Sequence, residues 1–252
     1  MANMDIPTAY LRTSFSRTSY NDMPLSHHYR HLPAGRTVSD LSAMPAAVIP
    51  QPPLVHRLGT VPYAPTLERM REFTLDRDNN TRDELWLLEH PPVYTAGIAA
   101  KTEHWPRFDN GIPVERIDRG GQITYHGPGQ LIAYLLLDLR RRGLSVRPLV
   151  RLMEQAVIEV LAGYNITAHG RPEAPGVYVG DAKIAALGLR VRNGCCYHGL
   201  ALNVDVDLAP FQAINPCGYP GLKVIRTADL DITDSRAQIG ERLIHCLLEK
   251  LQ

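Results

Sequence analysis

One cysteine, Cys217, lies in the sequence NPCGYPG (residues 215–221). Prolines and glycines on both sides of a residue are typical of a structured loop rather than a core strand. Thiolate is the reactive form of cysteine, so Cys217 is a candidate nucleophile if its surroundings stabilise that form. A structural cysteine in a turn is the alternative that this segment alone leaves open.

A glycine-rich segment with the sequence RGGQITYHGPGQ covers residues 119–130. Its glycines allow the backbone to approach a ligand closely and to present N–H groups to it. Arg119, Thr124, His126 and Gln130 add side-chain hydrogen-bonding groups. The segment lacks the Gly-Lys-Ser/Thr ending of a phosphate-binding P-loop and is no dinucleotide fingerprint. It predicts a ligand-binding loop, with a bulged hairpin holding a hydrogen-bonded histidine as the alternative.

Lys183 lies in the apolar stretch AKIAALG (residues 182–188). Strand alternation places its side chain on the face of Ala185 and Leu187. Such a lysine is either an edge-strand residue whose ammonium reaches solvent or a desolvated amine with a lowered pKa. His198 precedes a glycine in a similar stretch, and a buried, hydrogen-bonded histidine is its structural alternative.

The periodicity of apolar residues predicts the elements that must position these groups. Leu67, Met70 and Phe73 recur at helical spacing. The predicted helices are Tyr63–Asp76, Pro148–Tyr164 and one that begins with Thr233 or Asp234 as its N-cap. The predicted strands are Glu84–Glu89, Gly176–Val179, Lys183–Val191 and Tyr197–Val206, with a hairpin turn at Gly180-Asp181. This mixture predicts a single α/β (α+β) domain with a mixed sheet flanked by helices.

Composition limits the classes of protein to which the chain could belong. It has 252 residues, with 27 basic and 26 acidic side chains, and this balance argues against a broad nucleic-acid surface. The longest apolar run, Leu131–Leu137, falls short of the roughly 20 residues that a membrane helix needs. The four cysteines have neither a disulfide framework nor zinc-site spacing, so we expect a cytoplasmic location and no metal.

Residues 1–48 differ from the rest of the chain. They carry scattered Ser, Thr, Pro and His without a sustained apolar period, which predicts a disordered leader without a targeting role. We expect residues 49–252 to form the catalytic domain.

Taken together, the motifs resemble those of the octanoyl (lipoyl) transferase family. RGGQITYHGPGQLIAY (residues 119–134) is the most specific of them. The others are HPPVYTAG (90–97), AKIAALGLRV (182–191), HGLALNV (198–204) and NPCGYPG (215–221), in the family's order. The resemblance implies a fold similar to the catalytic domains of biotin and lipoate protein ligases.

The resemblance also implies an activity and a site. A transferase of this kind moves an octanoyl group from acyl carrier protein to a lysine of a lipoyl domain, without a cofactor. The acceptors would be lipoyl domains of 2-oxoacid dehydrogenase complexes and the glycine cleavage H protein. Cys217 would form the acyl-thioester and Lys183 would assist it. The implied substrate-binding positions are Arg119, Gly120, Gly121, Gln122, Ile123, Thr124, Tyr125, His126, Ala186, Leu187, Gly188, His198, Gly199 and Leu200.

Two further expectations concern the surroundings of the reaction. Backbone N–H groups around Cys217-Gly218 and in the glycine-rich segment are candidates to hold the oxyanion of each tetrahedral intermediate. Arg140, Arg141 and Arg142 are a candidate patch for an acidic carrier protein, with a solvated helix or strand end as the alternative. The competing functions are an ATP-dependent lipoate or biotin ligase and a non-catalytic acyl-binding module.

Overall fold

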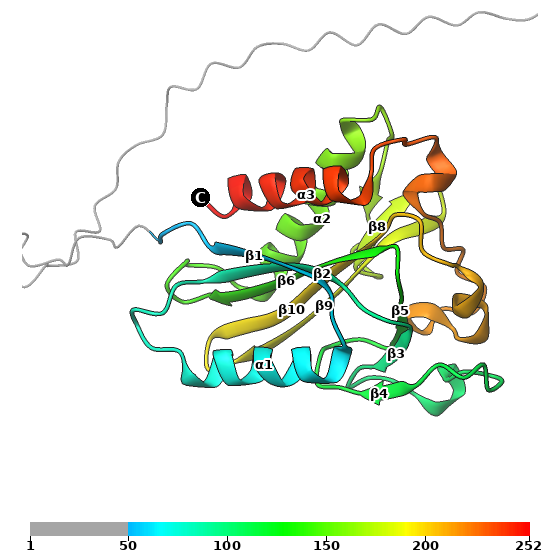
Figure 1. Cartoon of the computed structure of the whole chain (residues 1–252), viewed down its shortest axis with the longest axis horizontal. Coiled ribbons are helices and arrows are strands. Elements are labelled where there is room, and N and C mark those ends of the chain that lie inside the picture. The colour runs from blue at the N-terminus through cyan, green and yellow to red at the C-terminus, as the bar shows by residue number, and fades with distance from the viewer. Residues whose placement is uncertain (1–49) are drawn as a thin grey trace, which may run out of the picture. The chain divides into compact units, whose positions relative to one another are not determined.

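The computed structural model of the protein describes residues 50–252, and the predicted leader over residues 1–48 lies outside this part. The described part contains a large mixed sheet with helices on both faces and a smaller sheet beside it (Figure 1). The strands are β1 (Leu54–Thr60), β2 (Glu84–Glu89), β3 (Val93–Ala96), β4 (Val114–Arg116), β5 (Ile123–His126), β6 (Gln130–Asp138), β7 (His169–Gly170), β8 (Gly176–Val179), β9 (Ala182–Arg192) and β10 (Cys195–Asn203). The α-helices are α1 (Tyr63–Asp76), α2 (Val146–Ala162) and α3 (Arg236–Lys250), and the 3₁₀ helices are η2 (Thr102–His104), η3 (Ala209–Ala213), η4 (Pro216–Gly218) and η5 (Thr227–Leu230).

The large sheet has seven strands in the order β1-β2-β6-β10-β9-β8-β7. β1 and β2 run parallel, connected through α1, whereas every other neighbouring pair is antiparallel. The small sheet has the order β4-β3-β5, with one parallel and one antiparallel pair. The mixed sheet flanked by helices therefore confirms the predicted fold class.

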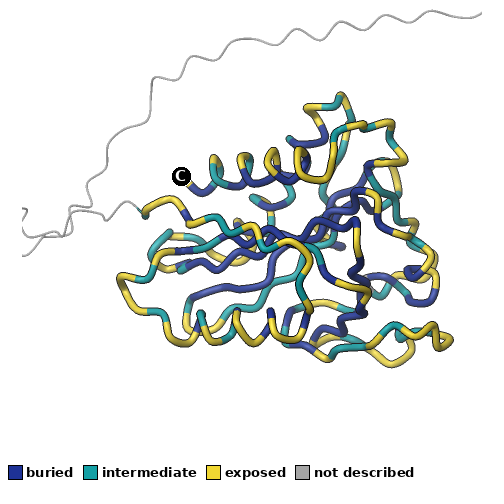
Figure 2. The backbone as a smooth tube through the Cα atoms, viewed as in Figure 1, coloured by how far each residue is buried: buried dark blue, intermediate teal, exposed yellow. Residues whose placement is uncertain are grey.

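The two faces of the large sheet are covered by different helices (Figure 2). Leu131, Ala133, Leu135 and Leu137 of β6 join the core under α2 and α3, while the intervening residues Ile132, Tyr134 and Leu136 join the core under α1. A strand that is covered on both faces needs apolar side chains at consecutive positions. This explains the long apolar run, which forms a central strand. None of the described helices is long and apolar enough to cross a membrane.

Several predicted boundaries are confirmed, and others move by a few residues. α1 and β2 have the predicted bounds, and β8 and β9 flank Gly180-Asp181 as expected. The N-cap of α3 is Ser235 rather than Thr233 or Asp234, because the hydroxyl of Ser235 accepts the N–H of Gln238. α2 begins at Val146, two residues before Pro148, because proline is tolerated within the first turn of a helix.

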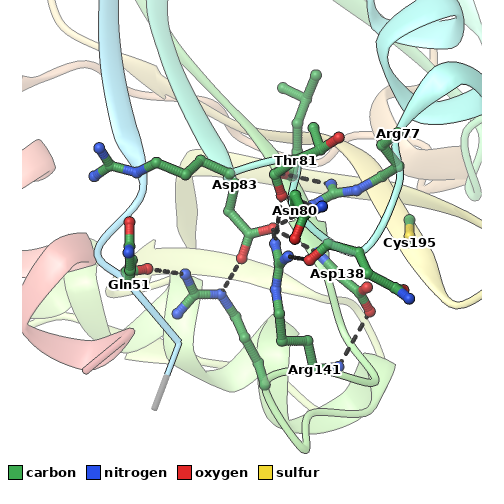
Figure 3. A network of polar contacts seen from close by, with 12 residues as sticks. Gln51, Arg77, Asn80, Thr81, Asp83, Asp138, Arg141 and Cys195 are labelled. Carbon is green, nitrogen blue, oxygen red and sulfur yellow. Dashed lines mark hydrogen bonds and ion pairs between the residues drawn. The ribbon is translucent and has the colours of Figure 1, made fainter. Parts of the chain in front are cut away.

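A buried ion-pair cluster ties the ends of the described part to the sheet (Figure 3). The carboxylate of Asp83, just before β2, contacts the guanidinium groups of Arg77, Arg141 and Arg142 and accepts the N–H of Asp138. Arg142 also donates to the carbonyl oxygens of Gln51 and Leu251. One carboxylate thus organises the α1–β2 connection, the end of β6 and both ends of residues 50–252.

This cluster corrects the interpretation of Arg140–Arg142 as a patch for an acidic partner. The side chains of Arg141 and Arg142 are only 20% and 3% exposed, since both pair with Asp83. Arg140 alone is well exposed, at 71%. The triplet is a structural element, and its exposed member, Arg140, lies 3.9 Å from the carboxylate of Asp138.

We expect Asp83→Asn to lower the free energy of unfolding at pH 7 by about 3–5 kcal/mol, because the buried guanidinium groups of Arg77 and Arg142 and the partly buried one of Arg141 lose their counter-charge. Burial alone would raise the pKa of Asp83, but the Asp138 N–H and the arginines lower it overall. The stabilisation is therefore present above the unfolded-state pKa, about 3.9, and is lost as pH falls through the lower folded-state pKa.

Urea titrations of the wild type and the variant across pH 3–7 measure this effect. The difference between the two proteins should shrink toward acid pH. Asp181→Asn is the matched control, because Asp181 is 95% exposed and pairs with Arg171 at the surface. A loss for Asp83→Asn as small as that of the control, below about 1 kcal/mol, would contradict the role of the cluster.

Candidate active site

A cavity of about 350 Å³ lies between the large sheet, the glycine-rich segment and the start of α2. Its wall brings together the residues predicted from separate motifs. Those that line it are Arg119, Gly120, Gly121, Gln122, Ile123, Thr124, His126, Lys183, Ala186, Leu187, Gly188, His198, Gly199 and Leu200. Tyr63 from α1, Tyr134 from β6 and Val146 from α2 are among the other residues that line it, and the motifs gave no role to these three.

Tyr125 is the predicted binding residue that the structure does not bring to the cavity. Its ring packs against Tyr94 and Phe211, with centroid distances of 5.6 and 5.4 Å. Alternation along β5 sends Thr124 and His126 the other way, because successive side chains of a strand point to opposite faces. Tyr125 thus belongs to the small core beneath β5.

A β-bulge places Lys183 in the cavity wall. Val177 pairs with Ala185 and Tyr178 with Lys183, so Ile184 has no partner on β8. Ile184 and Ala185 both join the core under α2, whereas Lys183 and Ala186 line the cavity. The predicted alternation, with Lys183 on the face of Ala185, is therefore wrong, because the bulge interrupts it.

The amine of Lys183 is held inside the protein. The residue is 3% exposed, which contradicts the alternative of a surface lysine reaching solvent. Its Nζ donates to the carbonyl oxygen of Pro175 at 3.1 Å and lies 5.3 Å from the ring centroid of Tyr178. A Cβ at Gly176 would lie 2.7 Å from Cε of Lys183, which is too close, so the lysine side chain fits here only because residue 176 is glycine.

The loop that contains Cys217 is anchored to the backbone of Lys183. Pro216–Gly218 forms η4, which lies beside β5 (Figure 1). Farther along this loop, the N–H of Lys183 donates to the carbonyl of Lys223 at 2.8 Å, and the N–H of Ile225 donates to the carbonyl of Lys183 at 3.0 Å. The side chain of Cys217 itself is outside the described part, but the chain on which it lies is bonded to the strand of Lys183.

The three cysteines whose side chains are described are poor nucleophiles. Cys195, Cys196 and Cys246 are free thiols. Burial raises the pKa of each, and that of Cys196 reaches about 12. A raised pKa leaves little thiolate at neutral pH.

A chain of buried hydrogen bonds begins at the cavity wall. Arg119 donates from Nη2 to both the carbonyl oxygen (2.6 Å) and the hydroxyl (2.9 Å) of Thr95. The Thr95 hydroxyl lies 3.2 Å from Nε2 of His126, and Nδ1 of His126 lies 2.7 Å from Oε1 of Gln130. Burial lowers the pKa of His126 to about 3, helped by nearby His90. The imidazole is therefore neutral.

The hydrogen bonds of Asn203, at the end of this series that is farthest from the cavity, show which group donates in each of the other bonds. Asn203 donates from Nδ2 to the carbonyl oxygen of Ile225 (3.0 Å), so its Oδ1 accepts from Nε2 of Gln130 (2.8 Å). Oε1 of Gln130 must then accept the Nδ1–H of His126, which leaves Nε2 as the acceptor of the threonine hydroxyl. The polar chain thus connects the cavity wall to Ile225, the residue bonded to Lys183.

His198 adopts an unusual backbone conformation. Its φ is +64°, in the left-handed region that non-glycine residues rarely adopt. Its ring stacks on that of the preceding Tyr197, with centroids 4.9 Å apart, so consecutive side chains share one face of β10. Nε2 of His198 lies 3.2 Å from the carboxylate of Asp118, which also accepts the hydroxyl of Tyr197. Burial lowers the pKa of His198 despite the opposing effect of Asp118.

Some of the backbone N–H groups that were expected to bind an oxyanion already donate hydrogen bonds within the protein. Those of Gly218 and Tyr219 donate to the carbonyls of Asn215 and Pro216, at 2.9 and 3.1 Å. That of Gly120 donates to Leu189 at 3.0 Å. The expectation is therefore wrong for Gly218 and Gly120, because the 3₁₀ turn and the contact with β9 take their hydrogen bonds. Among the described side chains, which do not include that of Cys217, no group of three or more His, Cys, Asp or Glu could hold a metal ion.

A family model for the lipoyl protein ligase A/B catalytic domain matches residues 62–240, which include every cavity-lining segment. The chain belongs to this family. The match confirms the family resemblance that the sequence motifs indicate. It also covers β5, β9, β10 and η4, the elements that bring the predicted residues together.

Curated relatives in the family are closely similar. The octanoyltransferase of Azoarcus sp. (strain BH72) is 65% identical over 82% of this chain and 91% of the relative. That of Aromatoleum aromaticum is 62% identical over the same shares. Solved structures agree in fold: a putative lipoate protein ligase from T. acidophilum has a TM-score of 0.65 and 20% identity, covering 80% of this chain and 86% of that one. At such identity the likeness concerns the fold alone.

Proposed function

We propose that this protein transfers an octanoyl group from octanoyl-acyl carrier protein to a lysine of lipoyl domains, through a thioester on Cys217. The observation that carries the proposal is the cavity that contains Lys183 and borders the loop of Cys217 through Tyr219. The curated relatives at 62–65% identity, which are named octanoyltransferases, support it. The proposed acceptors are the lipoyl domains of 2-oxoacid dehydrogenase complexes and the glycine cleavage H protein.

The first half-reaction exchanges one thioester for another. The thiolate of Cys217 attacks the carbonyl carbon of the donor, a new C–S bond forms, and the π electron pair moves to oxygen. Collapse restores the carbonyl and breaks the C–S bond to the donor thiol, which takes up a proton. Because a thioester replaces a thioester, this step needs no nucleotide.

The second half-reaction forms the amide. The acceptor lysine attacks the same carbonyl carbon as a neutral amine, a C–N bond forms, and the C–S bond to Cys217 breaks. The nitrogen loses a proton, and the thiolate returns. An amide is more stable than a thioester, so the transfer proceeds without ATP.

Lys183 is the residue that we propose to manage the proton. Its amine accepts the thiol proton of Cys217 or, as an ammonium, stabilises the thiolate; the two roles are coupled titrations of one pair. It then returns the proton to the departing donor thiol and accepts one from the attacking lysine. Its burial in the cavity wall and its backbone bonds to the loop of Cys217 support this assignment.

The cavity wall provides the binding energy for the acyl chain. Ala186, Gly188 and Leu200 line it with small or apolar groups. Each buried methylene contributes about 0.8 kcal/mol, so the six methylenes of an octanoyl group contribute about 5 kcal/mol. The polar positions Arg119, Thr124, His126 and His198 then orient the carbonyl end or shape the pocket.

We expect Ala186→Leu to shift the preference toward shorter acyl chains, because the larger side chain enters the cavity. The ratio of kcat/KM for hexanoyl over octanoyl carrier protein should rise by at least about 10–200-fold, the usual discrimination that one methylene gives in an apolar pocket. Ala162→Leu, at the exposed end of α2, is the matched control. An unchanged ratio in Ala186→Leu would contradict an acyl chain bound against β9.

The test of the function is transfer without nucleotide. The protein is incubated with octanoyl-acyl carrier protein and a lipoyl domain, and the mass of the lipoyl domain is followed. We expect one octanoyl group on the domain in the absence of ATP. An absolute ATP requirement, with free octanoate as the donor, would favour a ligase instead, and no transfer under either condition would favour a non-catalytic acyl-binding protein.

A further inference from the structure

Acyl transfer needs a hydrogen-bond donor that is free to meet the oxyanion of each tetrahedral intermediate. The turn of Cys217 supplies none from its next two residues, since the N–H groups of Gly218 and Tyr219 close the 3₁₀ turn. Another segment that reaches this turn and also lines the cavity is therefore a candidate source of such a donor.

Gln122 satisfies both conditions. It precedes β5 in the glycine-rich segment and lines the cavity. Its Cγ and Cδ lie 2.9 and 3.3 Å from the position that a Cβ on Gly218 would take. Gly218 also has a φ of +80°, so both its conformation and this close approach require glycine. The side chain of Gln122 is thus in contact with the residue that follows Cys217.

The orientation of the Gln122 amide is fixed by the backbone. The N–H of Lys101 donates to Oε1 of Gln122 at 3.1 Å, which assigns the oxygen to that side. The Nε2 group, with its two N–H bonds, is then the other end of the amide. Within residues 50–252, no hydrogen bond engages this Nε2. Gln122 is thus a side-chain donor beside the turn that contains Cys217, with its Oε1 held by the backbone and its Nε2 available.

We propose that Gln122 is a catalytic residue whose Nε2–H donates to the oxyanion of both tetrahedral intermediates. The proposal rests on the proposed function, because it assumes acyl transfer at Cys217. The electron pair that moves to the carbonyl oxygen on attack by the thiolate or the lysine amine meets this donor, and it returns to the carbon when the C–S bond breaks. The donor makes no covalent bond and exchanges no proton.

His104 is the competing donor at this turn. Its Nε2 lies 3.4 Å from the same Cβ position of Gly218, and its Nδ1 lies 3.2 Å from Nδ2 of Asn215. However, Oε1 of Glu103 lies 3.5 Å from this Nε2 and competes for its proton. Gln122 is therefore the better candidate, and an experiment can distinguish the two.

The test uses Gln122→Met in the full chain, because methionine keeps the length and neutrality of glutamine but has no N–H. Two rates are measured by intact mass: acylation by octanoyl-acyl carrier protein, and alkylation of Cys217 by iodoacetamide. Alkylation is a displacement that forms no oxyanion. Its rate therefore depends only on the amount of thiolate at Cys217 and on the folding of the loop around it. We expect acylation to fall by about 10²–10³-fold, while alkylation stays within about twofold of the wild type.

The controls separate the possible causes of a loss. Gln155→Met makes the same change on the exposed side of α2 and should leave both rates unchanged. Acylation of Gln122→Met within about threefold of wild type, or acylation and alkylation falling together, would overturn the role of Gln122. So would a loss of about 10²-fold in His104→Asn that Gln122→Met does not show. A wild type that alkylates but is never acylated would contradict the proposed function itself.

Discussion

Replacing Cys217 with alanine should abolish the octanoyl adduct on the protein and lower turnover by about 10⁴–10⁶-fold. The proposed route passes through a thioester on this sulfur, so without it the donor and the acceptor lysine must react directly. The variant should still bind the acyl chain, because Ala186, Gly188 and Leu200 of the cavity wall are unchanged in it. The KM for the donor should therefore change far less than kcat. Steady-state kinetics with octanoyl-acyl carrier protein and a lipoyl domain measure both.

Cys246→Ala is the matched control for this change. Cys246 is a free, partly exposed thiol on α3, and burial raises its pKa. Its removal should leave turnover within about twofold of wild type, since a surface substitution away from special features has little effect. Full activity in Cys217→Ala, or an adduct that disappears only in Cys246→Ala, would contradict the assignment of the nucleophile.

Replacing Lys183 with alanine should slow acylation at pH 7 by about 10²–10⁴-fold, the usual contribution of general acid–base catalysis. Without the amine, thiolate forms only through the thiol's own ionisation, with a pKa of about 8.5 for an ordinary cysteine. The loss should therefore shrink as pH rises through 8–9. Single-turnover acylation measured from pH 6 to 10 gives the profile.

Lys250→Ala provides a lysine control, because Lys250 pairs with Glu159 on α2 and α3. Its pH profile should follow that of the wild type. A loss in Lys183→Ala that stays constant across the pH range would contradict a role in the proton transfer. It would instead make Lys183 a structural residue of the cavity wall, which its contacts with Pro175 and Tyr178 hold in place.

The elements with a clear period could be predicted from the sequence. Leu67 and Met70 are buried on one side of α1, as their spacing requires, and β2 has the predicted bounds. Short strands such as β4 and β7 could not be found, because two or three residues show no period. The N-cap of α3 was missed among three adjacent candidates, since only geometry decides which hydroxyl reaches the N–H of Gln238.

The alternation of side chains along a strand could not predict where the backbone of the cavity wall is irregular. The bulge at Ile184 reverses the face of Lys183, and the positive φ of His198 turns its ring onto the face of Tyr197. Both departures put a polar side chain on the cavity side of an apolar strand. Local irregularity of this kind is common at functional sites, where a side chain must be re-aimed.

Long-range polar contacts were the other source of error. Three arginines that looked like a surface patch include two that pair with Asp83, more than fifty positions earlier in the chain. Thr95 and Asn203 carry the hydrogen-bond chain between Arg119 and Ile225, and their own segments predict no such role. A single sequence gives no signal for pairs so distant in the chain.

The central claim is that Cys217 forms the octanoyl thioester beside Lys183. Its most direct test is the intact mass of the wild-type protein after incubation with octanoyl-acyl carrier protein alone, followed by peptide mapping. We expect one octanoyl group, located on Cys217 and released when a lipoyl domain is added. Transfer to the lipoyl domain without any such adduct, or an adduct on another residue that the domain discharges, would contradict the claim.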